Sequence, residues 1–220
     1  AFLPGIAAHR SIEQNHKFAL DPKAKSLSLK DNPVHEDFID ALKLFKKDIF
    51  AIMTILDMDH NIYAATSGNI IDSFIPAVKK ANDVFAVKIR EKADIVVSIA
   101  KFPMDIDLYQ SQKAIENAKL ALKKDGILIL VSKCRDGIGS DTFVDLMSTC
   151  DTPKEVIEKI EKKYVLGYHK AARMAEIKLW AQVWGVTDLS HDVLRKIFID
   201  PFDSLQIAID NALKFKGTNA

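Results

Sequence analysis

Two apolar runs of strand length, separated by a segment of helix length, constrain the fold of this chain more than any other feature. Residues 94–100 form one continuous apolar run, and residues 127–132 form the other. Such runs are typical of parallel strands that are buried on both faces of a sheet. Between them, residues 107–122 are typical of a helix, with a stop and turn at 124–126. The spacing predicts a right-handed parallel βαβ crossover.

The rest of the second half continues this alternation. Trp180 and Trp184 stand four residues apart in an apolar stretch, so we expect both in the core. A strand is predicted at 182–186, and helices are predicted at 141–149, 153–163, 167–179, 190–197 and 202–215. Strands that alternate with helices indicate the α/β class, here a three-layer α/β/α C-terminal domain.

The first ninety residues have a different organisation. At most one short helix is expected within 1–18, and the polar stretch 19–32 is predicted to be a loop. Pro33 suits the first turn of a helix. A hairpin of 49–56 and 62–65, a helix at about 70–82 and a strand at 84–89 should follow. We interpret residues 1–90 as the remainder of a separate α/β N-terminal domain and residues 91–220 as the C-terminal domain, joined by the charged residues 90–92.

Composition excludes several classes of function. The 31 basic and 30 acidic residues leave a net charge of +1, which gives no electrostatic footprint for nucleic acid or an anionic membrane. No apolar run approaches the length that crosses a bilayer. Two cysteines cannot form a disulfide framework, and nothing resembles a signal peptide, so a cytoplasmic location is expected.

The strongest candidate site follows the first buried strand. Ligands of open α/β sheets bind beyond the carboxyl ends of the strands, and the loop 101–107 lies at such an end. Tyr109, Gln110 and Lys113 follow in the first turns of the helix. A phenol, an amide and an ammonium group at a helix N-terminus would suit a carboxylate or phosphate. A solvated helix face is the plainer interpretation of the same spacing.

Three other segments are weaker candidates. His16, after Asn15, could bind a metal, but one histidine makes no metal site. The glycine-containing segment 134–140 could bring backbone N–H groups to a ligand, although a plain turn is the better interpretation of Cys134. The start of the helix near 167–170 could bring His169 and Lys170 to the cleft, or could simply be solvated. Three further histidines lie in polar helix or turn contexts and are interpreted as surface residues: His35, His60 and His191.

Several of these segments together resemble one family, the nickel-dependent lactate racemases. The matching segments, in family order, are Leu3-Pro4-Gly5-Ile6 with Ile12 and Asn15-His16; Asp31-Asn32-Pro33-Val34; Ala93–Val97, Pro103–Gln110 and Lys113-Ala114; and Gly126–Val131 with Cys134–Gly139. They cover roughly residues 1–145. The pattern P-x-D-x-D-L-Y-Q-x-x-K, which ends at Lys113, is the most specific of them.

The resemblance implies roles for individual residues. His16 matches the histidine that coordinates nickel in a nickel-pincer nucleotide, a pyridinium-3-thioamide-5-thiocarboxylate mononucleotide. The polar cluster that closes over cofactor and substrate is matched by Tyr109, Gln110 and Lys113. The resemblance implies that Tyr109 and Lys113 bind the cofactor. It implies a catalytic role for Gln110 and Lys113. Lys113 would neutralise the substrate carboxylate or a cofactor oxygen. The implied reaction is racemisation of a 2-hydroxy acid by reversible transfer of its α-hydride through a keto acid.

The same resemblance implies parts that this sequence does not contain. The lysine that tethers the cofactor would directly precede Ala1, and the acid/base histidines and the substrate-binding arginine would belong to an earlier half. We therefore expect the N-terminal half of the same polypeptide as a partner and no activity from this chain alone. Tyr168 and His169 are candidates for a later aromatic contact. A non-catalytic module that binds an anionic small molecule in the cleft at 101–113, and a homo-oligomer, both stay open.

Overall fold

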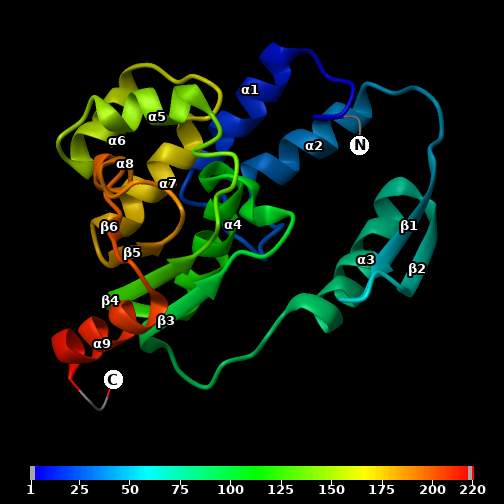
Figure 1. Ribbon diagram of the computed structural model, residues 1–220. Coiled ribbons are helices and arrows are strands. Elements are labelled where there is room, and N and C mark those ends of the chain that lie inside the picture. The colour runs from blue at the N-terminus through cyan, green and yellow to red at the C-terminus, as the bar shows by residue number, and fades with distance from the viewer. Residues whose placement is uncertain (1–2, 218–219) are drawn as a thin grey trace.

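Two separate β-sheets organise the chain in the computed structural model, which describes residues 3–217 and 220 (Figure 1). The first is an antiparallel hairpin of β1 (Phe50–Leu56) and β2 (Ile62–Asn69). The second is a parallel sheet in the order β3-β4-β5-β6. Its strands are β3 (Ala93–Ile99), β4 (Leu122–Val131), β5 (Gln182–Val186) and β6 (Asp200–Pro201).

Helices cover both faces of the parallel sheet, and α3 covers one face of the hairpin. The α-helices are α1 (His9–Lys17), α2 (Pro33–Lys43), α3 (Ile70–Phe85), α4 (Leu108–Ala118), α5 (Asp141–Ser148), α6 (Pro153–Lys162), α7 (Tyr168–Lys178), α8 (His191–Lys196) and α9 (Leu205–Lys216). Short 3-10 turns lie at Phe18–Leu20, Met104–Ile106 and Lys119–Ala121. As predicted, α2 starts at Pro33, and the side chain of Asn32 caps it by accepting from the backbone N–H of Val34.

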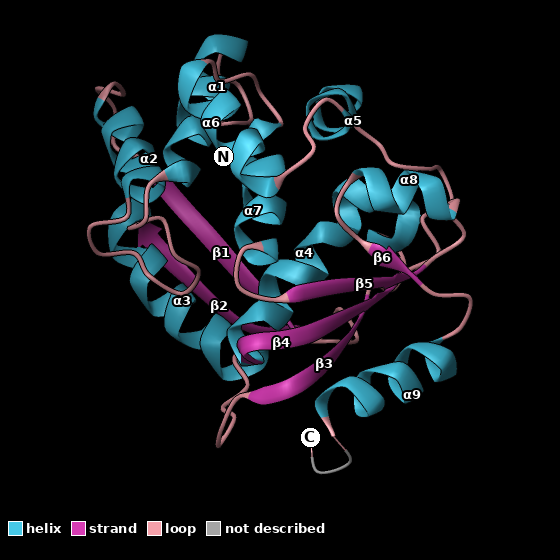
Figure 2. Ribbon diagram, turned by 90° about the vertical axis from the view of Figure 1, so that its left-hand side faces the viewer, coloured by secondary structure: helices cyan, strands magenta, loops and turns pink. Residues whose placement is uncertain are grey.

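Successive residues of β4 face opposite sides of the parallel sheet, and each side has its own core. Leu128 and Leu130 belong to the large core beneath α4 to α7, whereas Ile127 and Ile129 pack toward α9. All four are fully buried. Figure 2 shows α9 on the opposite side of the sheet from α4 and α7. The predicted α/β class and the three-layer arrangement of the second half are confirmed.

Both predicted tryptophans contribute to these cores. Trp184 is buried and stacks on Phe202 with ring centroids 4.5 Å apart. Trp180 is partly buried against the larger core. Both faces of the sheet are therefore covered at β4 and β5, whereas edge strand β3 is partly exposed, so its predicted burial on both faces is wrong.

One predicted strand, at 84–89, is wrong. Helix α3 continues to Phe85, and the segment that follows it is not in a strand. Phe85, Val87 and Ile89 are exposed, with Val87 85% exposed. An alternating apolar sequence forms a strand only where a neighbouring strand completes its hydrogen bonds, and none lies beside this segment among the described residues. Strand β6, which has only two residues, was not predicted at all.

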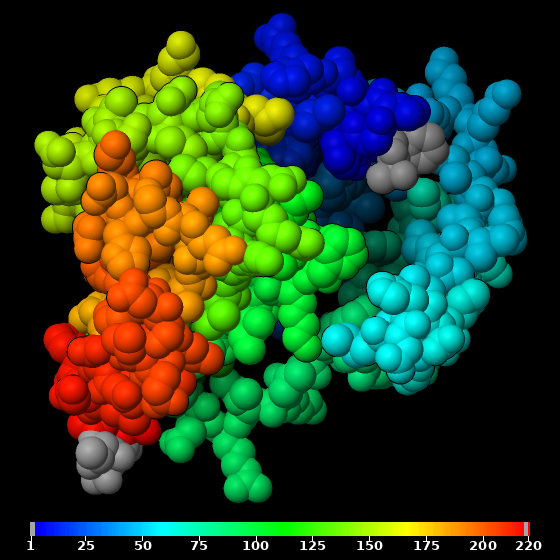
Figure 3. All heavy atoms as spheres, in the orientation of Figure 1, coloured from blue at the N-terminus to red at the C-terminus, as the bar shows by residue number. Residues whose placement is uncertain are grey.

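The hairpin has one covered face and one open face. Residues of β1 alternate in burial, so that Ile55 is buried against α3 while Phe50 and Ile52 are 73% and 71% exposed. Leu56 and Ile62 add to the open face. Figure 3 shows this hairpin, in cyan, at the rim of the molecule, away from the parallel sheet. The exposed apolar residues form a surface that an isolated soluble domain rarely presents.

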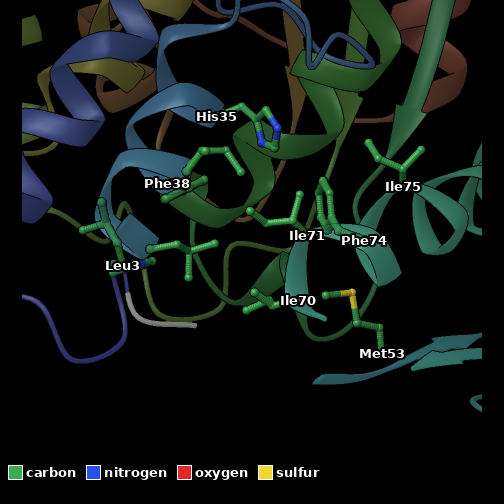
Figure 4. A pocket seen from close by; sticks show the side chains of 11 residues that line it. Leu3, His35, Phe38, Met53, Ile70, Ile71, Phe74 and Ile75 are labelled. Atoms are coloured by element: carbon green, nitrogen blue, oxygen red, sulfur yellow. The ribbon is translucent and has the colours of Figure 1, made fainter. Parts of the chain in front are cut away.

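An apolar groove of about 390 Å³ lies between α2 and α3 (Figure 4). Leu3, Phe38, Phe74 and Met53 are among the residues that line it. His35 lies here too, and its ring stacks on Phe74 with centroids 5.5 Å apart. His35 is therefore partly buried at the wall of an open groove, whereas His60 is exposed in the hairpin turn and His191 is a half-exposed residue beside Asp203. The proposed division at residues 90–92 stays a prediction.

Candidate functional site

The start of α4 is closed by the protein's own groups. Asp107 caps the helix, because its carboxylate accepts from the N–H of Gln110 at 2.6 Å. The N–H groups of Leu108 and Tyr109 donate to the carbonyls of Gly137 and Ile138. The next N–H, of Ser111, donates to the backbone oxygen of Asp107. These four groups would otherwise attract an anion. Side chains alone can therefore provide the anion site that we expected at this helix start.

The segment 134–140 holds the start of α4 in place by backbone hydrogen bonds and is not a ligand-binding loop. Its backbone pairs with the turn before α4, and a Cβ placed on Gly139 would lie 2.9 Å from both the Asp107 carboxylate and the Tyr109 Cβ. Cys134 is 2% exposed, and burial raises the pKa of its thiol. A buried neutral thiol is a poor nucleophile, which agrees with the interpretation of Cys134 as part of a turn. The segment 134–140 thus fixes where α4 begins.

The three predicted residues of α4 do not all point the same way. Lys113 donates to the Gln110 side chain at 2.8 Å, so these two form a pair on the exposed face. The ring of Tyr109 is partly buried and meets Phe143 edge-on. Burial raises the pKa of the Tyr109 phenol, so it stays protonated at neutral pH.

Lys170, at the start of α7, joins this group. Its Nζ lies 3.7 Å from the centre of the Tyr109 ring and also donates to the Tyr109 backbone carbonyl. In turn, Gln112 of α4 donates to the carbonyl of Lys170 at 2.6 Å. Burial and the positive charge of Lys113 lower the pKa of Lys170 to about 8. The first and fourth candidates of the sequence are thus one site, built where α4 meets α7.

His16 presents one free ring nitrogen. Its Nδ1 lies 2.8 Å from the carbonyl oxygen of Ile12, one turn earlier in α1. A carbonyl oxygen can only accept, so Nδ1 carries the proton in this bond and Nε2 keeps its lone pair. This arrangement is the one that histidine ligands of metals usually show, with the second nitrogen fixed by a carbonyl or carboxylate. The preceding residue, Asn15, is buried and ties α1 to Asp37 of α2 at 2.8 Å.

His169 lies against His16. The two rings meet edge-on with centroids 5.1 Å apart. The Tyr164 hydroxyl and His169 Nδ1 are 3.0 Å apart, which fixes the second ring. Burial, together with the charges of His16 and Lys170, lowers the pKa of His169 to about 4. His169 is therefore neutral at physiological pH and can pack against a metal ligand without repelling a cation.

Two further contacts fix α1 and the loop after it against α7. The carboxylate of Glu13 accepts from the N–H of Leu166 at 3.1 Å. Arg173 donates to the carbonyls of Ala19 and Ala24 and pairs with Glu176 at 3.0 Å. The two successive residues His169 and Lys170 consequently connect the metal-ligand candidate on one side with the α4 cluster on the other.

Tyr164 and Glu13 were not predicted, because their partners lie 5 and 153 residues away in the sequence. Spacing could not have identified them. Among the described residues, no group of three or more histidine, cysteine or acidic side chains could hold a metal ion. This part of the chain therefore offers single donors such as His16, and further donors would have to come from elsewhere.

A family model described as the lactate racemase C-terminal domain matches residues 88–220. The chain belongs to the lactate racemase family. It is 27% identical over 217 residues to the lactate racemase of Thermoanaerobacterium thermosaccharolyticum and 28% identical over 229 residues to that of Lactiplantibacillus plantarum. These alignments cover 95% and 99% of this chain but only 50% and 53% of the relatives. The chain thus spans about half the length of the curated relatives it matches.

Solved structures give the same assignment. The lactate racemase apoprotein of T. thermosaccharolyticum superposes with a TM-score of 0.91 over 98% of this chain and 53% of its own, at 27% identity. A Thermotoga maritima protein superposes with a TM-score of 0.69 at 15% identity, over 91% of this chain and 55% of its own, which shows likeness of fold alone. The family resemblance expected from the sequence is confirmed. No helix in the described part of the chain is long and apolar enough to span a membrane.

Proposed function

We propose that this chain is the cofactor-binding second half of a 2-hydroxy acid racemase or epimerase that uses nickel in a nickel-pincer nucleotide. Membership of the lactate racemase family supports the reaction class. The observation that carries the cofactor assignment is the free Nε2 of His16, which a backbone carbonyl and the His169 ring hold in place. We also propose a cytoplasmic location, because both cysteines are buried free thiols.

His16 fits such a cofactor by its chemistry. A metal held by protein side chains alone needs three or four of them, and His16 has no such companions among the described residues. A metal that an organic group already holds on its other sides needs only one further donor, and a neutral imidazole suits nickel. When bound, the cofactor would supply reversible acceptance of the substrate α-hydride.

The other site residues would bind and orient the substrate. Lys113, with its Nζ held toward Gln110, would meet the carboxylate next to the reacting carbon. The amide of Gln110 would donate to an oxygen of the substrate. Tyr109, neutral and partly buried, would form a wall of the site and help to exclude water. Proton transfer to and from the substrate hydroxyl is assigned to the other half of the polypeptide, where the family resemblance places the acid/base histidines.

The proposed function is tested with the complete polypeptide, made with the cofactor supplied. We expect about one nickel per chain and exchange of stereochemistry at C2 for at least one 2-hydroxy acid. A substrate labelled with deuterium at C2 should keep the label in the product, because the transferred hydride returns to the same carbon. Lys113→Met should raise KM strongly, because it removes the charge that meets the carboxylate. A protein without nickel and without turnover on a panel of 2-hydroxy acids would refute the proposal, and would favour a binding module without catalysis.

We propose that the partner of the open hairpin is the N-terminal half of the same polypeptide. The relatives are about twice as long as this chain. Leu3 and Pro4 line the apolar groove between α2 and α3, which adds to the apolar surface of this part of the chain. A two-stranded sheet is marginal by itself and needs further strands or a cover. The open face of Phe50, Ile52 and Leu56 offers such a surface.

Co-expression of the two halves as separate chains tests this partner. We expect a 1:1 complex, and Ile52→Lys should weaken it because a charge would enter an apolar interface. Ile207→Lys, at an exposed position of α9, is the matched control and should leave the complex intact. Self-association of this chain that persists when the other half is present would instead point to a second copy on the same face.

A further inference from the structure

Two positively charged groups at the α4–α7 junction have no acidic partner. Lys113 donates to the neutral amide of Gln110, and Lys170 donates to a carbonyl and lies over the Tyr109 ring. Neither forms an ion pair within the described part of the chain. Lys113 is exposed, but Lys170 is partly buried, and a lysine in such a position is usually paired. Two unpaired lysines side by side therefore indicate a place where a negative charge from another molecule is expected.

Both lysines line one cavity of about 460 Å³. It lies between α4, α7 and the loop around residues 24–26, and His169 and Gln112 also line it. Its other charged groups form ion pairs, although one carboxylate oxygen of Glu116 has no hydrogen-bond partner. Glu116 pairs with Lys119 at 2.6 Å, and Arg173 pairs with Glu176. The cavity walls therefore carry an excess of two positive charges, from Lys113 and Lys170.

We propose that this cavity binds the substrate and that the substrate is a 2-hydroxy acid with a second acidic group, a carboxylate or a phosphate. This inference rests on the proposed function. Lys113 meets the carboxylate beside the reacting carbon, and Lys170 meets the second acidic group. Lys170 is thereby the residue that determines specificity, since a monoanionic acid such as lactate gives it no partner.

The electrostatics of the empty cavity agree with this assignment. Burial and the charge of Lys113 lower the pKa of Lys170 to about 8, which means that the protein itself destabilises the charged form. Asp107 and Glu116 act in the opposite direction but do not compensate. A second anionic group would remove this cost. Lys170 is also positioned in advance, because the Tyr109 ring and carbonyl restrict its side chain.

The test uses the complete protein without cofactor and a matched pair of probes, lactate and 2-hydroxysuccinate, which differ by one carboxylate. Calorimetric titration at neutral pH should show 2-hydroxysuccinate binding about 10- to 100-fold more tightly, the range of one charge-assisted hydrogen bond. Lys170→Met should abolish this preference, because it should weaken the binding of 2-hydroxysuccinate far more than that of lactate. Lys170→Arg should keep the preference, and Lys162→Met, an exposed lysine at the end of α6, should have no effect.

Several results would overturn the inference. Equal binding of the two probes would do so, as would an equal loss for both in Lys170→Met. The same holds if Lys170→Arg folds normally but has lost the preference. If the preference disappears when the phosphorylated cofactor is supplied, Lys170 meets the cofactor phosphate instead. Binding is measured without nickel and without turnover. The test of the second acidic group therefore gives a result even if the racemase proposal fails.

Discussion

Gly139 gives the sharpest prediction about how the site is held. It has a φ of +97°, and an added Cβ would lie 2.9 Å from the Asp107 carboxylate and from the Tyr109 Cβ. Gly137, two residues earlier in the same segment, has a φ of +87° and open space around the position of its Cβ. The two glycines share a left-handed backbone conformation, which would strain any residue with a Cβ, and they differ in what a methyl group would meet. Alanine substitutions at both positions therefore separate the two effects.

The expected magnitudes follow from these contacts. Gly137→Ala should cost about 1 kcal/mol, because it places a Cβ in the left-handed region. Gly139→Ala should add about 1 kcal/mol for a disturbed helix cap at Asp107 and about 1 kcal/mol or more for overpacking. The difference between the variants is then about 2 kcal/mol. With a urea m-value of about 2–3 kcal/mol/M, the midpoint of Gly139→Ala should lie about 0.7–1 M lower.

Fluorescence of Trp180 and Trp184 during urea unfolding provides the assay, because both lie in or against the cores of the parallel sheet. Far-ultraviolet circular dichroism should give the same midpoints. Equal destabilisation by the two substitutions would refute the argument that Gly139 is required by its close approach to α4. A more stable Gly139→Ala would refute it more strongly.

The other predictions concern single contacts. Asn15→Ala should lower the free energy of unfolding by about 1–3 kcal/mol, because it removes the buried donor to Asp37. Asn211→Ala, at an exposed position of α9, is the control in the same urea titration and should cost much less. Lys170 has a lowered pKa of about 8 in the folded state, so the unfolded chain binds more protons between about pH 8 and the ordinary lysine value near 10.4. Stability relative to Lys170→Met should therefore rise with pH across that window, and a fall would contradict the assigned environment.

Much of the fold was accessible from the sequence because the physical signals were local. The two-sided burial of β4 was predicted from its continuous apolar run, although the strand begins five residues earlier, at Leu122. The same prediction was wrong for β3, because it is an edge strand and its Val97 and Ile99 are 38% and 56% exposed. The start of α2 followed from Pro33 beside a capping asparagine. The error at 84–89 arose because an apolar alternating pattern was present without a partner strand. Local pattern indicates what a segment prefers, but pairing decides whether a strand forms.

The site was only partly accessible for a related reason. Tyr109, Gln110 and Lys113 lie close together in sequence, so one helix presents them. The contacts of His16 with His169 and of Lys170 with Tyr109 join residues 153 and 61 positions apart. No periodicity encodes such contacts. The expected backbone anion site at α4 failed because the segment 134–140 supplies carbonyl groups to the helix N–H groups, which only the folded chain reveals.

Nickel retention by the complete polypeptide is the measurement that tests the central proposal most directly. His16→Ala should lose nickel and racemase activity together, because the only donor assigned to this chain is removed. His9→Ala, an exposed histidine at the start of the same helix, should retain both. Metal content by mass spectrometry and racemisation of a 2-hydroxy acid would be determined on the same samples. If His16→Ala retained nickel at the level of His9→Ala, the assignment of His16 as the metal ligand would be contradicted.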